Sequence, residues 1–401
     1  MKISINANRC EPSPMRKFHP LAVRARNEGK TIYHLNIGQP DLPTPAAFYE
    51  NVRSFDSSTV AYAESPGMPI LIDSIRDYYK KLDVDLAPDD VLITSGGSEA
   101  LLLTCLSILD PYTEVIIPEP YYPNYTTFVH AAGGVIRALH TGPEEGYHYA
   151  DRKKIQSLIT KNTRAILITN PGNPTGVVLD EAEMRMIADI AKENDLYLIC
   201  DEVYREFCYD DKYGIPCMGR FDDLDDHLVI IDSVSKRFSA CGARVGCVIT
   251  KNKDLQQAVL KFCQSRLAVA TLDQIGAAAL YSVDQEFFQR SKEEYRRRRD
   301  LVVDRLRKIP GVEVTEPMGA FYVMANLPVD NADKFQRWLL ESFDDHGDTV
   351  MFAPGAPFYE TPGKGISEVR IAYVQELSKL ERAMEVLKIG IEQYRKEIMM
   401  I

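Results

Sequence analysis

Short apolar runs recur between residues 90 and 250, and turn-forming residues bound each of them. Amphipathic stretches separate the runs, so strands and helices are expected to alternate. Each run is continuous rather than interrupted by polar residues, which is typical of strands covered on both faces. The runs are VLIT at 91, EVIIP at 114, AILIT at 165, LYLIC at 196, LVIID at 228 and RVGCVIT at 244. This pattern predicts an α/β fold with a doubly wound, mainly parallel sheet.

The pattern changes near residue 280. Residues 284–308 form a charged segment that predicts one long helix. Strand-like runs follow, namely GVEVT, GAFYVMANL, TVMFAPG and EVRIAYV, with a predicted helix around residues 335–343. These elements predict a second, smaller α+β unit.

The chain of 401 residues has a formal net charge of -11 and an isoelectric point near 5.3. This acidic balance gives no general attraction to nucleic acid, so any phosphate site must be local. The RRRR run at 296–299 is the exception, but it follows Glu293 and Glu294 on the predicted helix. A solvated, partly self-neutralised helix face is favoured over a nucleic-acid contact.

No apolar stretch approaches the roughly 20 residues that span a bilayer, and the start MKISINANRC lacks the apolar core of a signal peptide. We therefore expect a cytoplasmic protein. The eight cysteines form no C-x-x-C pair, and reduced, buried thiols are expected. The histidines form no H-x-x-x-H cluster, so no metal site is expected.

Polar segments directly follow five of the apolar runs. In an open α/β sheet, ligands bind beyond the carboxyl ends of the strands, so these segments are the candidates for a site. They are SGGSEA at 95, PEPYYPNY at 118, NPGNPTG at 170, DEVY at 201 and SVSK at 233. We expect glycines, aromatic rings, an amide, an acid and a lysine to meet in one crevice.

The glycine segment at 95–100 leads straight into an apolar helical stretch. Backbone N–H groups at a helix N-terminus bind a phosphate dianion without net positive charge on the protein. A plain helix-capping turn is the simpler explanation of the glycines alone. Ser233 and Arg244 strengthen the phosphate interpretation, because they flank a candidate lysine and would add a hydroxyl and a fork of N–H donors.

That lysine is Lys236, which follows a strand predicted to be buried. A lone lysine usually lies on the surface. Here the strand end and the neighbouring Arg237 and Arg244 would lower the pKa of the amine, which a nucleophile that forms a Schiff base requires.

Asp201 ends the run LYLIC, where a carboxylate needs a cationic or hydrogen-bonding partner. A protonated pyridine nitrogen would be such a partner, although a structural or capping aspartate explains the residue equally well. Tyr204 would then reach a phenolic oxygen on the same ring, although a buried structural tyrosine is equally common, and Tyr122 would stack on the ring face. Two prolines fix Asn173 at another strand end, beyond what a plain turn needs.

Taken together, these motifs resemble the class I and II aminotransferases of the fold type I pyridoxal phosphate (PLP) enzymes. The resemblance also covers LNIGQPD at 35, YAESPG at 62, MGAFYVM at 318, APGAPF at 353 and EVRIAYV at 368. It implies a large PLP-binding domain at residues 46–280 and a small α+β domain from both termini, residues 1–45 plus 281–401. It also implies a homodimer in which each subunit completes the active site of the other.

The resemblance assigns roles by position. Lys236 would bind PLP as a Schiff base, Asp201 would pair with the pyridine nitrogen, Tyr204 and Asn173 would bind the phenolic oxygen, and Tyr122 would stack on the ring. The phosphate would be held by Gly97, Ser98, Ser233 and Arg244, with Tyr62 reaching in from the neighbouring subunit. Arg370 would bind the substrate α-carboxylate, helped by Asn173 and the backbone of Gly38.

The implied reaction is a ping-pong transfer of the amino group from an L-amino acid to a 2-oxo acid. In it, the Lys236 amine moves the Cα proton as general base and then as general acid. An aspartate-like or an aromatic donor is expected. Family members that prefer aspartate often carry lysine where this chain has Ser98, which puts a simple aspartate assignment in doubt. Arg266 would be an alternative cation, although a surface arginine is the favoured interpretation.

Three other functions share parts of this pattern. A C–S β-lyase of the same fold uses the same carbanion chemistry. A PLP-sensing regulator would need a DNA-binding domain, and the aminotransferase pattern starts by about residue 20, which leaves no room for one. A doubly wound domain for another phosphorylated ligand is the third alternative.

Overall fold

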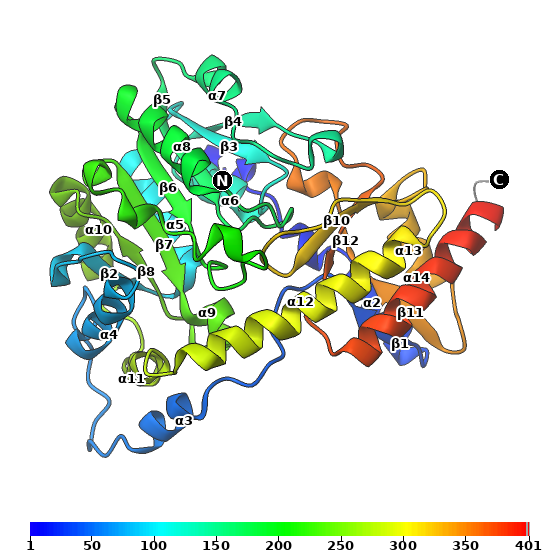
Figure 1. The fold of residues 1–401 in the computed structure, drawn as a ribbon, viewed down its shortest axis with the longest axis horizontal. Coiled ribbons are helices and arrows are strands. Elements are labelled where there is room, and N and C mark those ends of the chain that lie inside the picture. Colours follow the sequence, from blue (N-terminus) through cyan, green and yellow to red (C-terminus); the bar gives the residue numbers. More distant parts are fainter. Residues whose placement is uncertain (398–399, 401) are drawn as a thin grey trace.

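A computed structural model describes residues 1–397 and 400. Its centre is a seven-stranded sheet in the order β2-β8-β7-β6-β5-β3-β4 (Figure 1). The strands are β2 (Val91–Thr94), β3 (Glu114–Glu119), β4 (Val135–His140), β5 (Thr163–Thr169), β6 (Tyr197–Asp201), β7 (Leu228–Ser233) and β8 (Gly246–Ile249). Only β8 is antiparallel to its neighbours, and because it is antiparallel to both β2 and β7, β2 runs in the same direction as the rest. The carboxyl ends of β2, β3, β5, β6 and β7 therefore meet at one edge.

The predicted apolar runs all form strands of this sheet, which confirms the doubly wound fold. The edge strand β4 was not predicted. Its sequence VIRALH interrupts the apolar residues with Arg137 and ends in His140, and only Ile136 and Leu139 of its six residues are buried. Such an edge strand lacks the continuous apolar run by which the inner strands were recognised.

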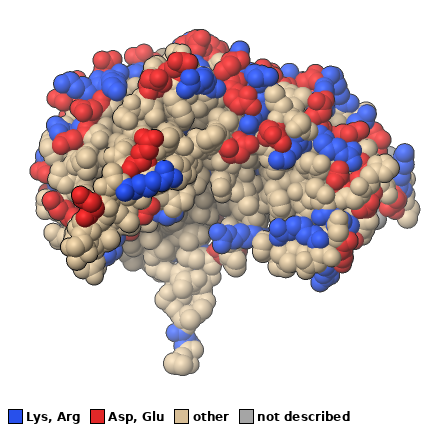
Figure 2. Space-filling model, turned by 90° about the horizontal axis from the view of Figure 1, so that it is seen from below, with Lys and Arg blue, Asp and Glu red and all other residues tan. Residues whose placement is uncertain are grey.

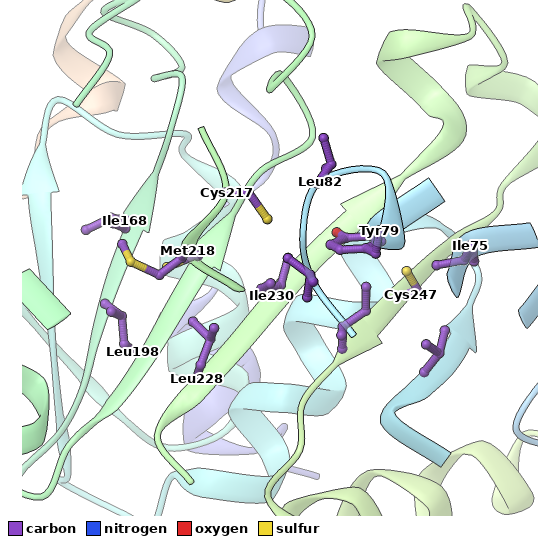
Figure 3. Close-up of a cluster of buried hydrophobic side chains, with 14 of the residues drawn as sticks. Ile75, Tyr79, Leu82, Ile168, Leu198, Cys217, Met218, Leu228, Ile230 and Cys247 are labelled. Atoms are coloured by element: carbon purple, nitrogen blue, oxygen red, sulfur yellow. The ribbon is translucent and has the colours of Figure 1, made fainter. Parts of the chain in front are cut away.

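Both faces of the sheet are covered, as the continuous runs require. Alternate residues of β6 and β7 enter different hydrophobic clusters: Leu198 and Ile230 belong to one, and Ile199 and Ile231 to the other. Figure 3 shows part of the first cluster, where Leu198, Leu228 and Ile230 lie along the sheet. The helices of this part are α3 (Ala46–Arg53), α4 (Pro69–Lys80), α5 (Gly96–Ile108), α6 (Asn124–Ala131), α7 (Arg152–Leu158), α8 (Glu181–Glu193), α9 (Val234–Arg237), α10 (Lys253–Ser265) and α11 (Thr271–Leu280).

A smaller α+β unit is built from both ends of the chain, as predicted. Strand β1 (Thr31–His34) pairs in parallel with β11 (Asp348–Met351), so the first and last parts of the chain lie side by side (Figure 1). A second sheet has the order β12 (Ala353–Pro354), β13 (Glu368–Ala372), β10 (Tyr322–Asn326) and β9 (Glu313–Val314). The helices are α2 (His19–Asn27), α12 (Gln285–Arg307), α13 (Ala332–Glu341) and α14 (Leu377–Glu397). The division at residues 46–280 stays a prediction.

The arginine run lies on α12, but only half of it is a solvated face. Arg296 and Arg297 are exposed and pair with acids one turn earlier. Arg298 and Arg299 are buried, against the expectation. The guanidinium of Arg298 donates to Asp41 Oδ1 at 2.6 Å and to the carbonyl of Val374, which fixes α12 to two other segments of the chain.

The N-terminal segment crosses from one part of the molecule to the other. Helix α1 (Ile5–Arg9) packs on α6 of the large part, where Asn6 and Arg9 donate to the carbonyls of Ala131 and Gly134. A 3-10 turn at Pro14–Arg16 follows, and α2 then enters the small unit. All eight cysteines are unpaired and six of them are buried. Within the described residues, no helix is long and apolar enough to cross a membrane.

Glycine is required where β8 passes the start of α5. A Cβ atom on Gly246 would lie 2.6 Å from the backbone carbon of Gly96 and 2.7 Å from the carbonyl oxygen of Asp232. We expect Gly246→Ala to lower the free energy of unfolding by about 1–3 kcal/mol, because the backbone must move to admit the methyl group. Urea unfolding measures this change. The matched control is Gly242→Ala, whose Cβ would meet nothing within 4 Å. Equal effects of the two substitutions would contradict the explanation.

Candidate active site

A cavity of about 720 Å³ lies at the carboxyl edge of the central sheet. Side chains from the strand ends, the start of α5, the Pro14–Arg16 turn and the small unit line it. All the predicted site residues except Tyr62 are part of this lining: Gly38, Gly97, Ser98, Tyr122, Asn173, Asp201, Tyr204, Ser233, Lys236, Arg244 and Arg370. The sheet topology thus brings together residues that are far apart in the sequence.

Lys236 projects into this cavity from α9, a single helical turn directly after β7. Its Nζ donates to the carbonyl oxygen of Gly38 at 2.9 Å. The turn is capped by the hydroxyl of Ser233, which accepts from the N–H of Ser235 at 3.1 Å. The amine is therefore held by a neutral acceptor and is free of any carboxylate partner among residues 1–397 and 400.

A buried ion cluster supports the turn that carries Lys236. Asp232, the last residue but one of β7, pairs with the guanidinium of Arg237 and accepts from the N–H of Ser233 at 2.7 Å. Its other oxygen accepts from the hydroxyl of Tyr79 at 3.0 Å and lies 3.7 Å from Arg205. Because these groups are buried, losing one partner would leave an uncompensated charge. The cluster thus fixes the backbone on both sides of Lys236.

Asp201 lies at the end of β6 and is buried. Its carboxylate accepts from the hydroxyl of Tyr125 at 2.6 Å and from the N–H of Val203 at 3.4 Å. Burial raises the pKa of Asp201 to about 6, although these hydrogen bonds oppose the shift. No ion pair to Asp201 exists in the part of the chain that is described, so a cationic ring nitrogen fits this carboxylate.

Tyr204 and Asn173 lie together on another wall. The Tyr204 hydroxyl is 3.0 Å from the hydroxyl of Tyr322 and accepts from Nδ2 of Asn173 at 3.5 Å. Burial raises the pKa of Tyr204 well above its ordinary value, so this phenol remains a hydrogen-bond donor at neutral pH. A phenolate oxygen on a ligand would find both an O–H and an N–H donor here. Tyr122 also lines the cavity, and burial raises its pKa to about 12.

The glycine segment and Arg244 form a donor-rich corner. Helix α5 begins at Gly96, whose φ of +76° favours glycine. A Cβ there would lie 2.5 Å from Nη2 of Arg244, so the glycine lets the guanidinium approach the loop. Arg244 donates to the carbonyls of Cys241 at 3.0 Å and Ser95 at 3.3 Å. With the helix N-terminus, these groups suit a phosphate dianion.

Arg370 lies on β13, is buried and faces the cavity from the small unit. Its guanidinium donates to the carbonyl of Asn36 at 2.6 Å and to Oδ1 of Asn173 at 3.0 Å, and it lies over the ring of Tyr322. The Nε atom has no hydrogen-bond partner within the described residues. A buried guanidinium held only by neutral acceptors suits a carboxylate ligand.

Tyr62 and the alternative cation Arg266 lie elsewhere. Tyr62 is 84% exposed and is outside the cavity of its own chain. Arg266 also lies outside the cavity; its guanidinium pairs with Glu99 at 3.1 Å and donates to the carbonyl of Ile93 at 2.6 Å. Arg266 is therefore part of the support of α5, in line with the preferred structural interpretation, although it is half-buried rather than on the surface.

Several lining residues were not predicted. Tyr125 lies three residues after Tyr122 at the start of α6, and helical spacing in PEPYYPNY would have indicated it. Ser235 and Tyr322 lie inside motifs that were recognised. The others are Ser13, Met15, Arg16, Asn36, Ile37, Leu101, Asn124, Val203 and Cys241. The N-terminal members come from a segment with no periodic pattern, so no sequence signal marked them.

These groups define a class of protein. A lysine amine, a phosphate corner and a buried carboxylate fit the aldehyde, phosphate and ring nitrogen of PLP, as in the enzymes of fold type I. The chain belongs to the class I and II aminotransferases, because the model of that family matches residues 30–387. It is thus a PLP-dependent transaminating enzyme that acts on amino acids and 2-oxo acids.

Known proteins of similar sequence and structure agree with this family. An aspartate aminotransferase of Pyrococcus horikoshii is 34% identical, covering 94% of this chain and 94% of that protein. An aspartate/prephenate aminotransferase of Thermus thermophilus is 29% identical over 94% of this chain and 95% of that protein. The structure of an aspartate aminotransferase from Thermus thermophilus with maleate superimposes with a TM-score of 0.88 at 28% identity, over 97% of this chain and 100% of that one. Neither the lyase nor the regulator alternative is favoured by these similarities.

The raised pKa of Asp201 makes stability depend on pH in a defined direction. The fold favours the protonated acid, so the cofactor-free protein loses stability as pH rises from about 4 to about 6. Asp201→Asn removes this pH-dependent contribution to stability, because the amide does not titrate. We expect the free energy of unfolding of the variant, relative to the natural protein, to grow by about 2–3 kcal/mol between pH 4 and pH 7. Urea unfolding of the two cofactor-free proteins measures this difference, and a constant difference across that range would contradict it.

Proposed function

We propose that this enzyme transfers the amino group of an acidic, aspartate-like amino acid to a 2-oxo acid in a ping-pong cycle. The observation that carries the proposal is the convergence of Lys236, Asp201 and Arg370 on one cavity. The names of the similar proteins support the acidic donor, because aspartate recurs in them. An aromatic donor has no equally direct support.

Each group of residues would have its own chemical role. Lys236 would hold PLP through its amine, Asp201 would keep the ring nitrogen protonated, and the corner of Gly97, Ser98, Ser233 and Arg244 would hold the phosphate. The bound cofactor supplies an electron sink that makes the substrate Cα–H acidic. When it is free of the linkage to PLP, the Nζ of Lys236 would accept the substrate Cα proton as general base and then donate a proton as general acid.

Other residues orient the substrate. Arg370 would bind the α-carboxylate through its fork of donors, and the Oδ1 of Asn173 keeps that fork in place at 3.0 Å. Tyr122 would stack on the cofactor ring. The carbonyl of Gly38, which accepts from the amine of Lys236 at 2.9 Å, would position the amine before the cofactor binds. This contact gives Gly38 a role toward the lysine in addition to the predicted one toward the substrate.

Substrate screening on the PLP-loaded enzyme tests the proposal. We expect aspartate and glutamate, offered singly, to convert the bound cofactor to its amine form faster than the other amino acids, followed by absorbance. We expect Lys236→Ala to fold normally by circular dichroism and to lose about 10³-fold or more of the transfer rate, because it removes both the attachment point and the base. Substantial transamination by this variant would refute the assignment. Release of pyruvate and ammonia from a thioether amino acid would instead indicate a lyase.

A homodimer with shared sites is part of the proposal. Tyr62 would bind the cofactor phosphate of the neighbouring subunit, which agrees with its exposure outside its own cavity. Exposed large apolar side chains concentrate in the first 70 residues, including Ile3, Ile37 and Val60. Figure 2 shows a face whose charged residues lie mainly around its upper and outer parts, with a broad area of few charges below them. Such a surface suits contact with a second copy.

Mixing two defective variants measures site sharing. Tyr62→Ala and Lys236→Ala are each expected to have low activity, while hybrid dimers contain one complete site. Random assortment after subunit exchange should restore about a quarter of the natural activity. Without exchange, or without sharing of Tyr62, the mixture would show only the mean of the two variants. The cytoplasmic location and the domain boundaries stay predictions.

A further inference from the structure

Four cationic side chains line the active-site cavity, and the proposed function uses three of them. Lys236, Arg244 and Arg370 are assigned to the cofactor amine linkage, the phosphate and the α-carboxylate. The fourth is Arg16, from the N-terminal 3-10 turn. Asp201 is the one acidic side chain in this lining, and it faces the expected ring nitrogen. The cavity thus has one more positive charge than the cofactor and a monocarboxylate substrate require.

The turn that carries Arg16 is fixed close to the substrate end of the cavity. The neighbouring Met15 places its Sδ 3.4 Å from Nη2 of Arg370, and its carbonyl accepts from Nδ2 of Asn36 at 3.5 Å. The N–H of Arg16 itself donates to the carbonyl of Ser13 at 3.1 Å, which closes the turn. Arg16 therefore directly follows a residue whose side chain contacts Arg370, the group that would hold the α-carboxylate.

The cations near Arg16 in the sequence have partners of their own. Arg9 donates to the carbonyl of Gly134 at 2.9 Å, and Lys17 pairs with Asp333. For Arg16, by contrast, neither a hydrogen bond nor an ion pair of the guanidinium is present in residues 1–397 and 400. An arginine without an internal partner at a cavity wall is available to an anionic ligand.

We propose that Arg16 binds the side-chain carboxylate of a dicarboxylic substrate within its own subunit. The inference rests on the proposed aminotransferase function and names the residue that sets its acidic preference. When the substrate α-carboxylate is bound to Arg370, the guanidinium of Arg16 pairs with the second carboxylate, on the substrate side chain. This assignment supplies the cation that Ser98 lacks and that Arg266, held by Glu99, does not provide.

Binding of simple acids to the PLP-loaded enzyme tests the assignment without turnover. Succinate carries two carboxylates, and butyrate matches it in carbon number with one. We expect Arg16→Gln to raise the dissociation constant of succinate about 10- to 100-fold by calorimetry and to change that of butyrate less than about twofold. Arg16→Lys, which keeps the positive charge, should bind succinate more tightly than Arg16→Gln and less tightly than the natural enzyme. Lys17→Gln, the exposed neighbour, is the matched control and should change neither constant.

Kinetics separate this inference from the proposed function. We expect Arg16→Gln to lower kcat/KM for aspartate and 2-oxoglutarate by a similar factor, with kcat/KM for alanine unchanged. If the natural enzyme transaminates neither aspartate nor glutamate, the proposed donor is wrong, and the succinate measurement alone decides on Arg16. Unchanged succinate binding in Arg16→Gln, or equal losses for succinate and butyrate, would overturn the assignment.

A mixture of variants tests the claim that Arg16 serves its own subunit. In hybrids of Arg16→Gln with Lys236→Ala, every site that has a lysine also has glutamine at position 16 if Arg16 acts within its subunit. We therefore expect no recovery of aspartate turnover. Recovery to about a quarter of the natural activity would show that Arg16 reaches the neighbouring site and would overturn this part.

Discussion

The active site depends on holding several positive charges close together without neutralising them. Lys236 donates to the carbonyl of Gly38, Arg244 to the carbonyls of Cys241 and Ser95, and Arg370 to a carbonyl and an amide oxygen. Neutral acceptors orient a cation but leave its charge available to a ligand. Carboxylates in the same places would have formed internal pairs and competed with the phosphate and the substrate.

The opposite arrangement lies behind the site. There the charges are fully paired: Asp232 neutralises Arg237, and Glu202 lies 2.6 Å from Arg205, all of them buried. Replacing such a cluster by apolar residues would often be neutral for stability, so its value lies in fixing geometry. It fixes the short α9 turn, which is too short to be stable by itself, at the end of β7. The paired charges thus hold the turn of Lys236 in place, and the unpaired cations of the cavity bind the ligands.

The sequence predicted the central sheet and most of the cavity because both follow from local rules. Continuous apolar runs indicated the inner strands, and the polar residues after Thr94, Thr169 and Cys200 indicated the binding edge. The edge strand β4 was not predicted because a polar residue interrupts its apolar run and only two of its six residues are buried. The burial of Arg298 and Arg299 was not predicted because it depends on contacts with Asp41 and Pro317, which are distant in the sequence and which no local pattern specifies. The Pro14–Arg16 turn is a wall of the cavity only because α1 docks on α6 and β1 pairs with β11.

The path of the N-terminal segment has an evolutionary consequence. The groups that would act on the cofactor sit on the sheet and on the turns it supports, where most substitutions disturb packing. Arg16 sits on a surface turn between two docked elements, where a substitution changes no buried contact. Substrate preference and reaction chemistry are thus encoded in separate parts of the chain. Homologous enzymes could acquire new amino-acid preferences through drift in this segment while inheriting the same catalytic apparatus.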